Sequence, residues 1–167
     1  MVPIVEPEVL MDGDHSADIC LRKTSDVIKK CFDEFILNKV DLSGIILKPN
    51  MILAGNNSKV KISNEEVAQK TLQCLKNSVP TEVPGIAFLS GGQSEIEATE
   101  NLNIINKNNN TQFIMTYSYG RALQQSALKI WSKNTKDIKA TQSTFNHRAK
   151  MCTLAAKGEW SFELENK

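Results

Sequence analysis

The sequence predicts an α/β fold in which short apolar strands alternate with helices along one chain. Four apolar runs, each followed by apolar residues at helical spacing, indicate successive parallel strand–helix units. Strands that read as nearly continuous apolar runs are typical of a parallel sheet buried on both faces. With 167 residues, of which 41% are hydrophobic and 23% charged, the chain has an ordinary globular composition and enough length for one sizeable core.

The predicted strands are four short apolar runs, most of them followed by a proline or by glycines. They share β-branched or aromatic residues and are too short for a stable helix: 2–6, 44–47, 85–89 and 113–117. Pro7 ends the first run and Pro49 closes the second, while the glycine pair at 91–92 breaks the chain after the third.

The predicted helices share apolar residues three or four positions apart: 23–38, a helix that begins after residue 63, a helix from 94 to about 106, 122–131, and a longer terminal helix over 135–156. Two of them begin with the pattern of a capping box, Ser63 with Glu66 and Ser94 with Glu97. Gly158 lies where the terminal helix is expected to stop.

Two architectures fit this order, a doubly wound sheet and a (β/α)8 TIM barrel, and the polar residues separate them. Candidate site residues follow every predicted strand at its carboxyl end: Glu6 and Glu8, Lys48, Ser90 and Gly91, and Gly120 and Arg121. Barrel enzymes build their active sites from the carboxyl ends of several strands. Open α/β sheets bind ligands there too, but chiefly at one switch point. We therefore expect the barrel.

A complete barrel of this kind needs about 250 residues, so four strand–helix units plus a terminal helix make half of one. We expect residues 1–158 to form the half-barrel and residues 159–167 a short, truncated tail. Two parallel edge strands and an apolar inner face would be left exposed in such a body. The sequence therefore suggests its own incompleteness.

Composition and motifs exclude several classes of protein. The net charge of +1, without a basic cluster, favours neither nucleic acid nor an anionic membrane surface. No apolar run is long enough to span a bilayer, and the N-terminus lacks the basic region of a signal peptide. The cysteines have no metal-ligand spacing (positions 20, 31, 74 and 152), and His15 and His147 are isolated. We expect a soluble cytoplasmic protein with reduced thiols and no structural metal.

Glu6 and Glu8 are two residues apart on an extended segment, so we expect their side chains to point the same way. Two carboxylates at the mouth of an apolar barrel repel each other and lose hydration, which favours the protonated form of one of them. Such a carboxyl group can exchange protons near neutral pH. The alternative is a solvated strand end followed by a turn.

Lys48 directly follows the apolar run 44–47, where a charged side chain is costly unless it is paired or neutral. Burial favours the free amine, which is the form that attacks a carbonyl carbon. The alternative is a lysine whose stem is buried while its ammonium reaches solvent.

Two glycine motifs between strands and helices resemble anion cradles. SGGQ at 90–93 precedes the helix expected to begin at Ser94, and YGR at 119–121 repeats the arrangement one unit later with a guanidinium suited to phosphate. Adjacent late strands that share one phosphate site are a recurrent barrel feature. Taken singly, each motif could also be an ordinary glycine turn.

Four segments resemble class I fructose-bisphosphate aldolases, in family order and at family-like spacing from residue 2 to about 158: VPIVEPE at 2–8, LKPNM at 47–51, FLSGGQSE at 88–95 and YGRALQ at 119–124. NLN at 101–103 and ALKIW at 127–131 are also similar to family segments. Four long motifs in register make the resemblance highly specific.

The resemblance implies a lyase of glycolysis and gluconeogenesis that cleaves fructose 1,6-bisphosphate reversibly to dihydroxyacetone phosphate and glyceraldehyde 3-phosphate. It implies that Lys48 forms the Schiff base, that Glu6 acts as acid and base, and that Glu8 pairs with lysine ammonium groups. The phosphate of the sugar would be held by Ser90, Gly91, Gly120 and Arg121. No metal or cofactor is implied, and the family assembles as tetramers.

The sequence also departs from the family. The N-terminal half of the family's barrel is absent, together with an aspartate, further lysines and an arginine of the pocket. The chain ends at Lys167 without the family's terminal tyrosine, and the loop at 107–112 looks one residue shorter. We expect the isolated chain to be weakly active or inactive. Two alternatives remain: a non-catalytic half-barrel that binds a sugar phosphate or a protein partner, and a transaldolase-like Schiff-base enzyme.

Overall fold

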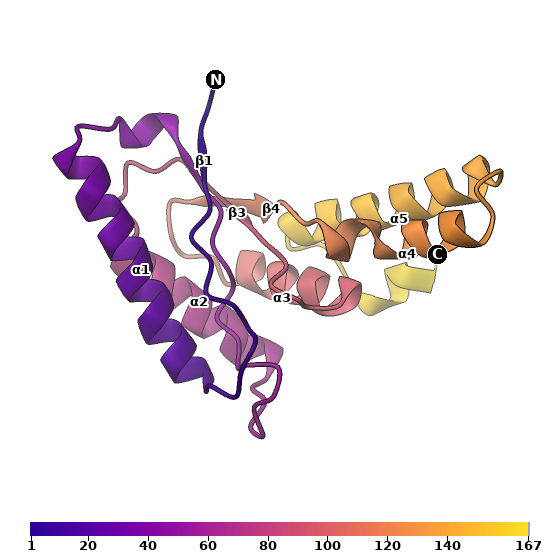
Figure 1. The fold of residues 1–167 in the computed structure, drawn as a ribbon, viewed down its shortest axis with the longest axis horizontal. Helices are drawn as coiled ribbons and strands as arrows, with labels where there is room; N and C mark the ends of the chain where they lie inside the picture. The colour runs from indigo at the N-terminus through magenta and orange to yellow at the C-terminus, as the bar shows by residue number, and fades with distance from the viewer. Residues whose placement is uncertain (167) are drawn as a thin grey trace.

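The computed structural model describes residues 1–166 and contains one four-stranded parallel sheet (Figure 1). Its strands are β1 (Ile4–Val5), β2 (Ile46–Leu47), β3 (Gly85–Phe88) and β4 (Ile114–Tyr117). They pair in chain order, each with the next, through parallel registers. A doubly wound sheet reverses its strand order at a switch point. This sheet does not reverse, so the predicted barrel-type order is confirmed.

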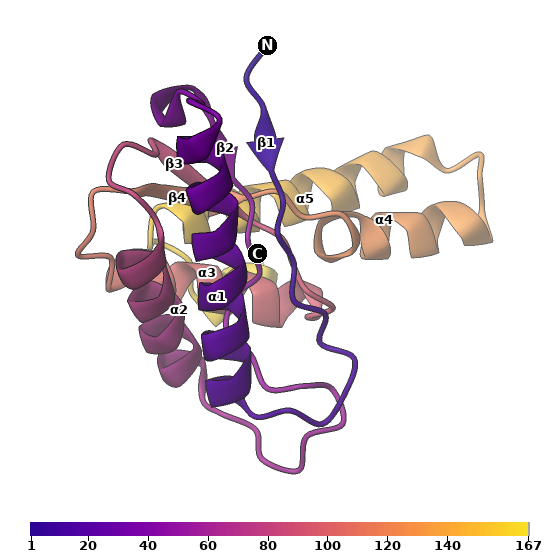
Figure 2. The same cartoon turned by 60° about the vertical axis from the view of Figure 1, so that its left-hand side comes forward.

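Each strand is followed by a helix, and a fifth helix ends the repeat. The helices are α1 (Ala17–Leu37), α2 (Asn64–Ser78), α3 (Glu95–Lys107), α4 (Arg121–Lys133) and α5 (Ile138–Ala156), with short 3-10 turns η1 (Leu42–Gly44) and η2 (Phe162–Asn166). Figures 1 and 2 show α1, α2 and α3 side by side along one side of the sheet, while α4 and α5 form a hairpin that extends away from it.

Helix boundaries follow the capping residues more closely than the apolar spacing. Helix α1 begins at Ala17, six residues before the predicted start, because the Ser16 hydroxyl accepts a hydrogen bond from the first turn. Ser63 caps α2 in the same way, but the predicted capping box there is only half formed. The Glu66 carboxylate contacts Lys70 at 3.5 Å and is not bonded to the Ser63 N–H.

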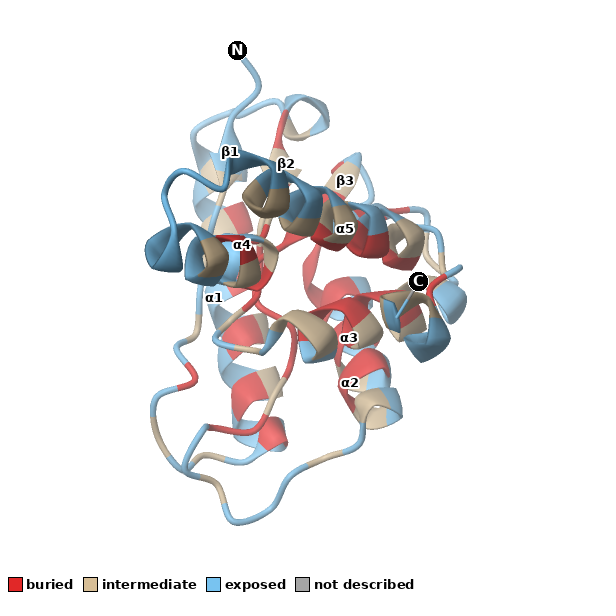
Figure 3. Ribbon diagram, turned by 90° about the vertical axis from the view of Figure 1, so that its right-hand side faces the viewer, coloured by how far each residue is buried: buried red, intermediate tan, exposed pale blue. Residues whose placement is uncertain are grey.

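The core lies between the sheet and the helices that cover it. Side chains from every layer are fully buried, among them Ile28, Leu47, Ile86, Phe88 and Leu102. Each such side chain contributes about 1.5–3 kcal/mol by leaving water. Figure 3 shows the buried residues gathered on the helix faces that meet the sheet, and exposed residues toward the far end of the α4–α5 hairpin.

The two edge strands carry apolar side chains that are largely exposed. Ile4 on β1 is 55% exposed and Ile114 on β4 is 76% exposed. This is the surface expected of a barrel segment with open edges. Among residues 1–166, no helix combines the length and the apolar character that crossing a membrane would require.

The tail is docked on the body. Trp160 is 4% exposed, and Glu165 in η2 pairs with Arg148 of α5 through two hydrogen bonds of 2.8 Å. Lys167, the last residue of the predicted tail, lies outside the described residues.

Candidate active site

The segments that follow the strands stay aligned with one another, because backbone hydrogen bonds between neighbouring segments continue beyond the strand ends. Three further bonds share this role: Lys48 N–H to Val5 O (2.7 Å), Leu89 N–H to Pro49 O (3.1 Å) and Ser118 N–H to Phe88 O (2.8 Å). The residues that follow these bonds therefore emerge at one edge of the sheet. All the predicted site residues come from that edge.

Glu6 and Lys48 are in direct contact. The Lys48 Nζ lies 2.9 Å from Glu6 Oε1, and the preceding Leu47 is fully buried. The lysine side chain is 18% exposed and the glutamate 47% exposed, so solvent or a ligand can reach both. An amine and a carboxylate at this distance can pass a proton between them.

Glu8 is placed differently. Strand β1 ends at Val5, so the two-residue periodicity of a strand does not extend to Glu6 and Glu8. Glu8 is exposed and has no hydrogen bond or ion pair to any other described residue. Its assignment as a partner for lysine ammonium groups remains a prediction.

The SGGQ loop is a tight turn after β3. Gly91 and Gly92 have φ angles of +56° and +80°, in the left-handed region that glycine adopts without strain. The Ser90 carbonyl accepts two bonds from Gln93, one from its N–H (3.0 Å) and one from its side chain (2.8 Å). A Cβ atom built on Gly92 would lie 4.0 Å from Nη2 of Arg121, so the loop and the guanidinium are neighbours.

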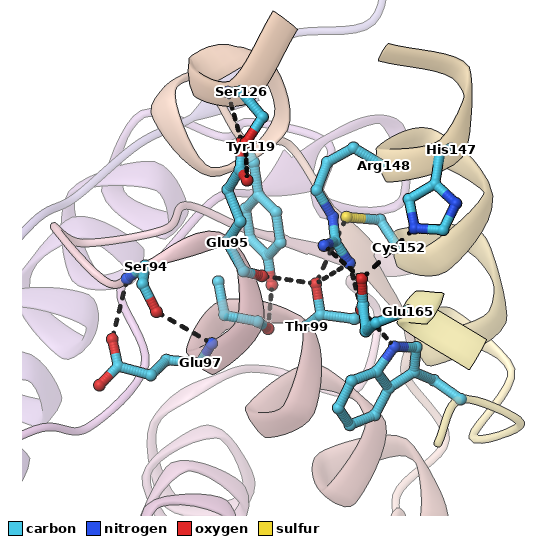
Figure 4. Close-up of polar contacts among 12 residues, drawn as sticks. Ser94, Glu95, Glu97, Thr99, Tyr119, Ser126, His147, Arg148, Cys152 and Glu165 are labelled. Carbon is cyan, nitrogen blue, oxygen red and sulfur yellow. Dashed lines mark hydrogen bonds and ion pairs between the residues drawn. The ribbon is translucent and has the colours of Figure 1, made fainter. Parts of the chain in front are cut away.

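The two helix starts beside this loop are not equivalent. At α3 the capping box is complete, because Ser94 accepts from the Glu97 N–H (3.2 Å) and Glu97 accepts from the Ser94 N–H (2.9 Å) (Figure 4). At α4 the cap is Gly120, which has no side chain to offer the first-turn N–H groups. Helix α4 is therefore the better anion site of the two, since its N-terminal groups and dipole have no capping side chain.

A carboxylate that sequence reasoning missed joins these two helices. Glu95 accepts hydrogen bonds from the N–H (2.8 Å) and hydroxyl (2.5 Å) of Ser126 in α4 (Figure 4). The bonds fix the start of α3, and with it the SGGQ loop, relative to α4. No short-range signal could have identified a contact between residues 31 positions apart.

Asn50, two residues after Lys48, is a buried polar residue that sequence reasoning also did not single out. It is 2% exposed, and its amide bonds to the Val9 N–H, to Thr24 and to the Met51 carbonyl. A signal was available, because an asparagine among the apolar residues that follow β2 needs partners. The identity of the partners is set by tertiary structure.

Comparison with known proteins supplies the family. A protein-family model described as "Glycolytic: Fructose-bisphosphate aldolase class-I" matches residues 1–167. The chain is 44% identical over 161 residues to a "Probable fructose-bisphosphate aldolase class 1" of Xanthomonas campestris pv. campestris, which covers 96% of the chain and 48% of the relative. It is 47% identical to "Fructose-bisphosphate aldolase 3, chloroplastic" of Arabidopsis thaliana, with 99% of the chain and 42% of the relative covered.

Among solved structures, a fructose-bisphosphate aldolase from Plasmodium falciparum superposes with a TM-score of 0.93 at 41% identity, over 96% of this chain and 46% of that one. The chain thus spans about half the length of the relatives it matches.

Proposed function

The chain belongs to the class I fructose-bisphosphate aldolase family, and from that premise we propose that it carries the imine-forming and C1-phosphate-binding part of an aldolase active site. The observation that supports this most strongly is the 2.9 Å contact between Lys48 Nζ and Glu6 Oε1 at the carboxyl edge of the sheet. An amine and a carboxylate at this distance can exchange a proton, as imine formation requires.

In the proposed reaction the free amine of Lys48 adds to the carbonyl carbon of fructose 1,6-bisphosphate. Glu6 then gives a proton to the hydroxyl group of the resulting carbinolamine. This group leaves as water, and an iminium ion remains on Lys48. When the C3–C4 bond breaks, its electron pair moves onto the iminium, the C4 hydroxyl proton passes to a base, and glyceraldehyde 3-phosphate leaves. Protonation of the remaining enamine at C3 and hydrolysis of the imine release dihydroxyacetone phosphate.

The phosphate end of the substrate is assigned to the two glycine motifs. The uncapped start of α4 at Gly120 and the Arg121 guanidinium supply donors and positive charge, and the Ser90–Gly91 turn lies beside them. Glu8 is assigned to lysine ammonium groups of the complete pocket, the role that the family resemblance implies for it.

A second function is favoured by the open edges. Ile4 and Ile114 are largely exposed, and the chain spans about half of its relatives. A half-barrel of this kind could bind a sugar phosphate or a protein partner without turnover. We expect little or no cleavage by the chain alone, because proximity and orientation contribute about 7–11 kcal/mol to catalysis and require a complete pocket.

Cleavage of fructose 1,6-bisphosphate after mixing the chain with the N-terminal half of a family barrel tests the proposal. We expect activity on mixing, its loss in Lys48→Met, and its retention in Lys139→Met, which removes an exposed lysine of α5. Equal activity in Lys48→Met and the control would refute the proposal. A folded complex that binds phosphate without cleavage would support the non-catalytic alternative.

A further inference from the structure

The Glu6–Lys48 contact requires a support that strand pairing does not provide. Strand β1 has only two residues and lies at the edge of the sheet, and its last ladder bond is Lys48 N–H to Val5 O. Glu6 lies one residue beyond that bond, and within residues 1–166 its side chain forms an ion pair with Lys48 and no other ion pair or hydrogen bond. A half-exposed ion pair of this kind contributes at most about 1 kcal/mol, too little to hold a chain segment in place.

The second anchor of this segment is Asn50. Its Oδ1 accepts a 2.9 Å hydrogen bond from the Val9 N–H, three residues after Glu6. The segment that carries Glu6 is therefore fixed at both ends to the residues around Lys48, at Val5 before it and at Val9 after it.

The orientation of the Asn50 amide is determined by its partners. The Val9 N–H can only donate, so it requires the oxygen. The Met51 carbonyl, 3.1 Å from Nδ2, can only accept, so it requires the nitrogen. Nδ2 also donates to Thr24 Oγ1 at 3.0 Å, and Thr24 is a buried residue of α1. The Val9 N–H and the Met51 carbonyl thus set the orientation of the amide, and Thr24 is an additional partner of its nitrogen.

We propose that Asn50 is a positioning residue that keeps Glu6 against Lys48. The proposal rests on the proposed function for its chemical purpose, but the positioning itself is a property of the folded chain. Alanine at this position would leave the partly buried Val9 N–H without its side-chain partner, and the segment that carries Glu6 would be fixed at Val5 alone. Asn50 would then act on Lys48 only through Glu6.

Acetylation of Lys48 by acetic anhydride, measured by peptide mass mapping, reports the ion pair without any substrate site and without imine chemistry. Pairing with Glu6 protects the amine, so Glu6→Gln and Asn50→Ala should each raise the Lys48 rate about two- to fivefold. Lys139, exposed on α5, serves as the internal reference. Thr24→Val is the matched control, because it disturbs the same buried network but keeps the Val9 bond, and should leave the rate unchanged.

The double variant separates positioning from a general loss of structure. If Asn50 acts through Glu6, Asn50→Ala adds nothing in the Glu6→Gln background, and the two effects are not additive. Additive effects, an unchanged rate in Asn50→Ala, or an equal rise in Thr24→Val would overturn the proposal. If Asn50→Ala does not fold, Asn50→Ser replaces it, since serine is polar but too short to reach Val9.

Trapping with dihydroxyacetone phosphate and borohydride in the same variants keeps the two proposals apart. A wild-type chain that is acetylated as expected but forms no trapped adduct contradicts the proposed function and leaves the positioning intact. A wild-type chain that forms the adduct, with Asn50→Ala equally fast, contradicts the positioning alone. We expect Asn50→Ala to form the adduct about tenfold more slowly or worse, the usual effect of a misplaced catalytic group.

Discussion

Two ion pairs in this chain show how differently a structural and a functional pair are built. Arg148 and Glu165 are 5% and 9% exposed and meet through two hydrogen bonds of 2.8 Å (Figure 4). Arg148 also donates to the Thr99 hydroxyl, and the Trp160 indole N–H donates to Glu165. Lys48 and Glu6 are 18% and 47% exposed and share one contact of 2.9 Å.

The difference in exposure and in the number of hydrogen bonds indicates a structural role for the first pair and a functional role for the second. Both terminal nitrogens of the Arg148 guanidinium and both oxygens of Glu165 bond within the fold, and the two side chains are almost closed to a ligand. The second pair leaves most of its hydrogen-bonding capacity open, and the backbone around it, more than the pair itself, sets its geometry. A site that must exchange protons and bind a carbonyl needs this second kind of pair.

The largest expected effect is on stability and comes from breaking the buried pair. Arg148→Met would leave the Glu165 carboxylate buried without its counter-charge, at a cost of about 3–5 kcal/mol in the free energy of unfolding. Urea unfolding followed by circular dichroism measures it. The double variant Arg148→Met with Glu165→Leu should recover part of the loss. A cost below about 1 kcal/mol would mean that the buried pair contributes no more than an exposed one.

Acid should weaken the same pair. Burial alone would raise the pKa of the Glu165 carboxyl, but hydrogen bonds from Arg148 and Trp160 outweigh it and hold the pKa below its ordinary value. A lowered pKa in the folded state stabilises the fold above the pKa of the unfolded carboxyl, about 4.3, and this contribution is lost as the pH falls through the folded value. The stability difference between wild type and Glu165→Gln should therefore narrow below about pH 4.3. A constant difference from pH 7 to pH 3 would contradict this.

The glycine loop should give an intermediate effect. Gly92 has a φ of +80°, which costs an alanine about 1–2 kcal/mol, whereas Gly120 has a negative φ and open space around its Cβ position. Gly92→Ala should thus destabilise the chain and Gly120→Ala should change its stability by less than about 0.5 kcal/mol. The melting temperatures of the two variants, measured side by side, test this difference. Equal melting temperatures would contradict it.

The smallest effect on stability should come from the exposed pair. Glu6→Gln is expected to change the free energy of unfolding by less than about 1 kcal/mol. Its effect on imine formation should be far larger, about 100-fold or more, because a positioned acid–base group is lost. The rate of borohydride trapping, measured with the unfolding curve of the same sample, compares the two. If the loss of stability in Glu6→Gln were large enough to account for the slower trapping, Glu6 would be a structural residue and not an acid–base group.

The sequence was sufficient to predict the order of strands and helices, because the apolar runs and their spacing are local. It was also sufficient to place Lys48, Ser90 and Gly120 at one edge, since the carboxyl ends of parallel strands meet there. The start of α1 was predicted wrongly, because the cap at Ser16 starts the helix before its apolar spacing becomes regular. The complete capping box predicted at Ser63 is only half formed, because Glu66 contacts Lys70 instead.

Contacts between distant residues could not be predicted from local patterns. Asn50 bonds Val9 across 41 positions, and Glu95 bonds Ser126 across 31. Both are single polar side chains whose partners are brought near only by the packed sheet and helices. They are also the residues that give the candidate site its geometry, so this part of the site required the structure.

The most direct test of the account is reduction of the folded chain with borohydride in the presence of dihydroxyacetone phosphate, followed by peptide mass mapping. The account predicts one adduct on Lys48, formed more slowly in Glu6→Gln and absent in Lys48→Met. A folded chain that acquires no adduct, or acquires it on another lysine, would contradict the assignment of Lys48 as the imine-forming residue.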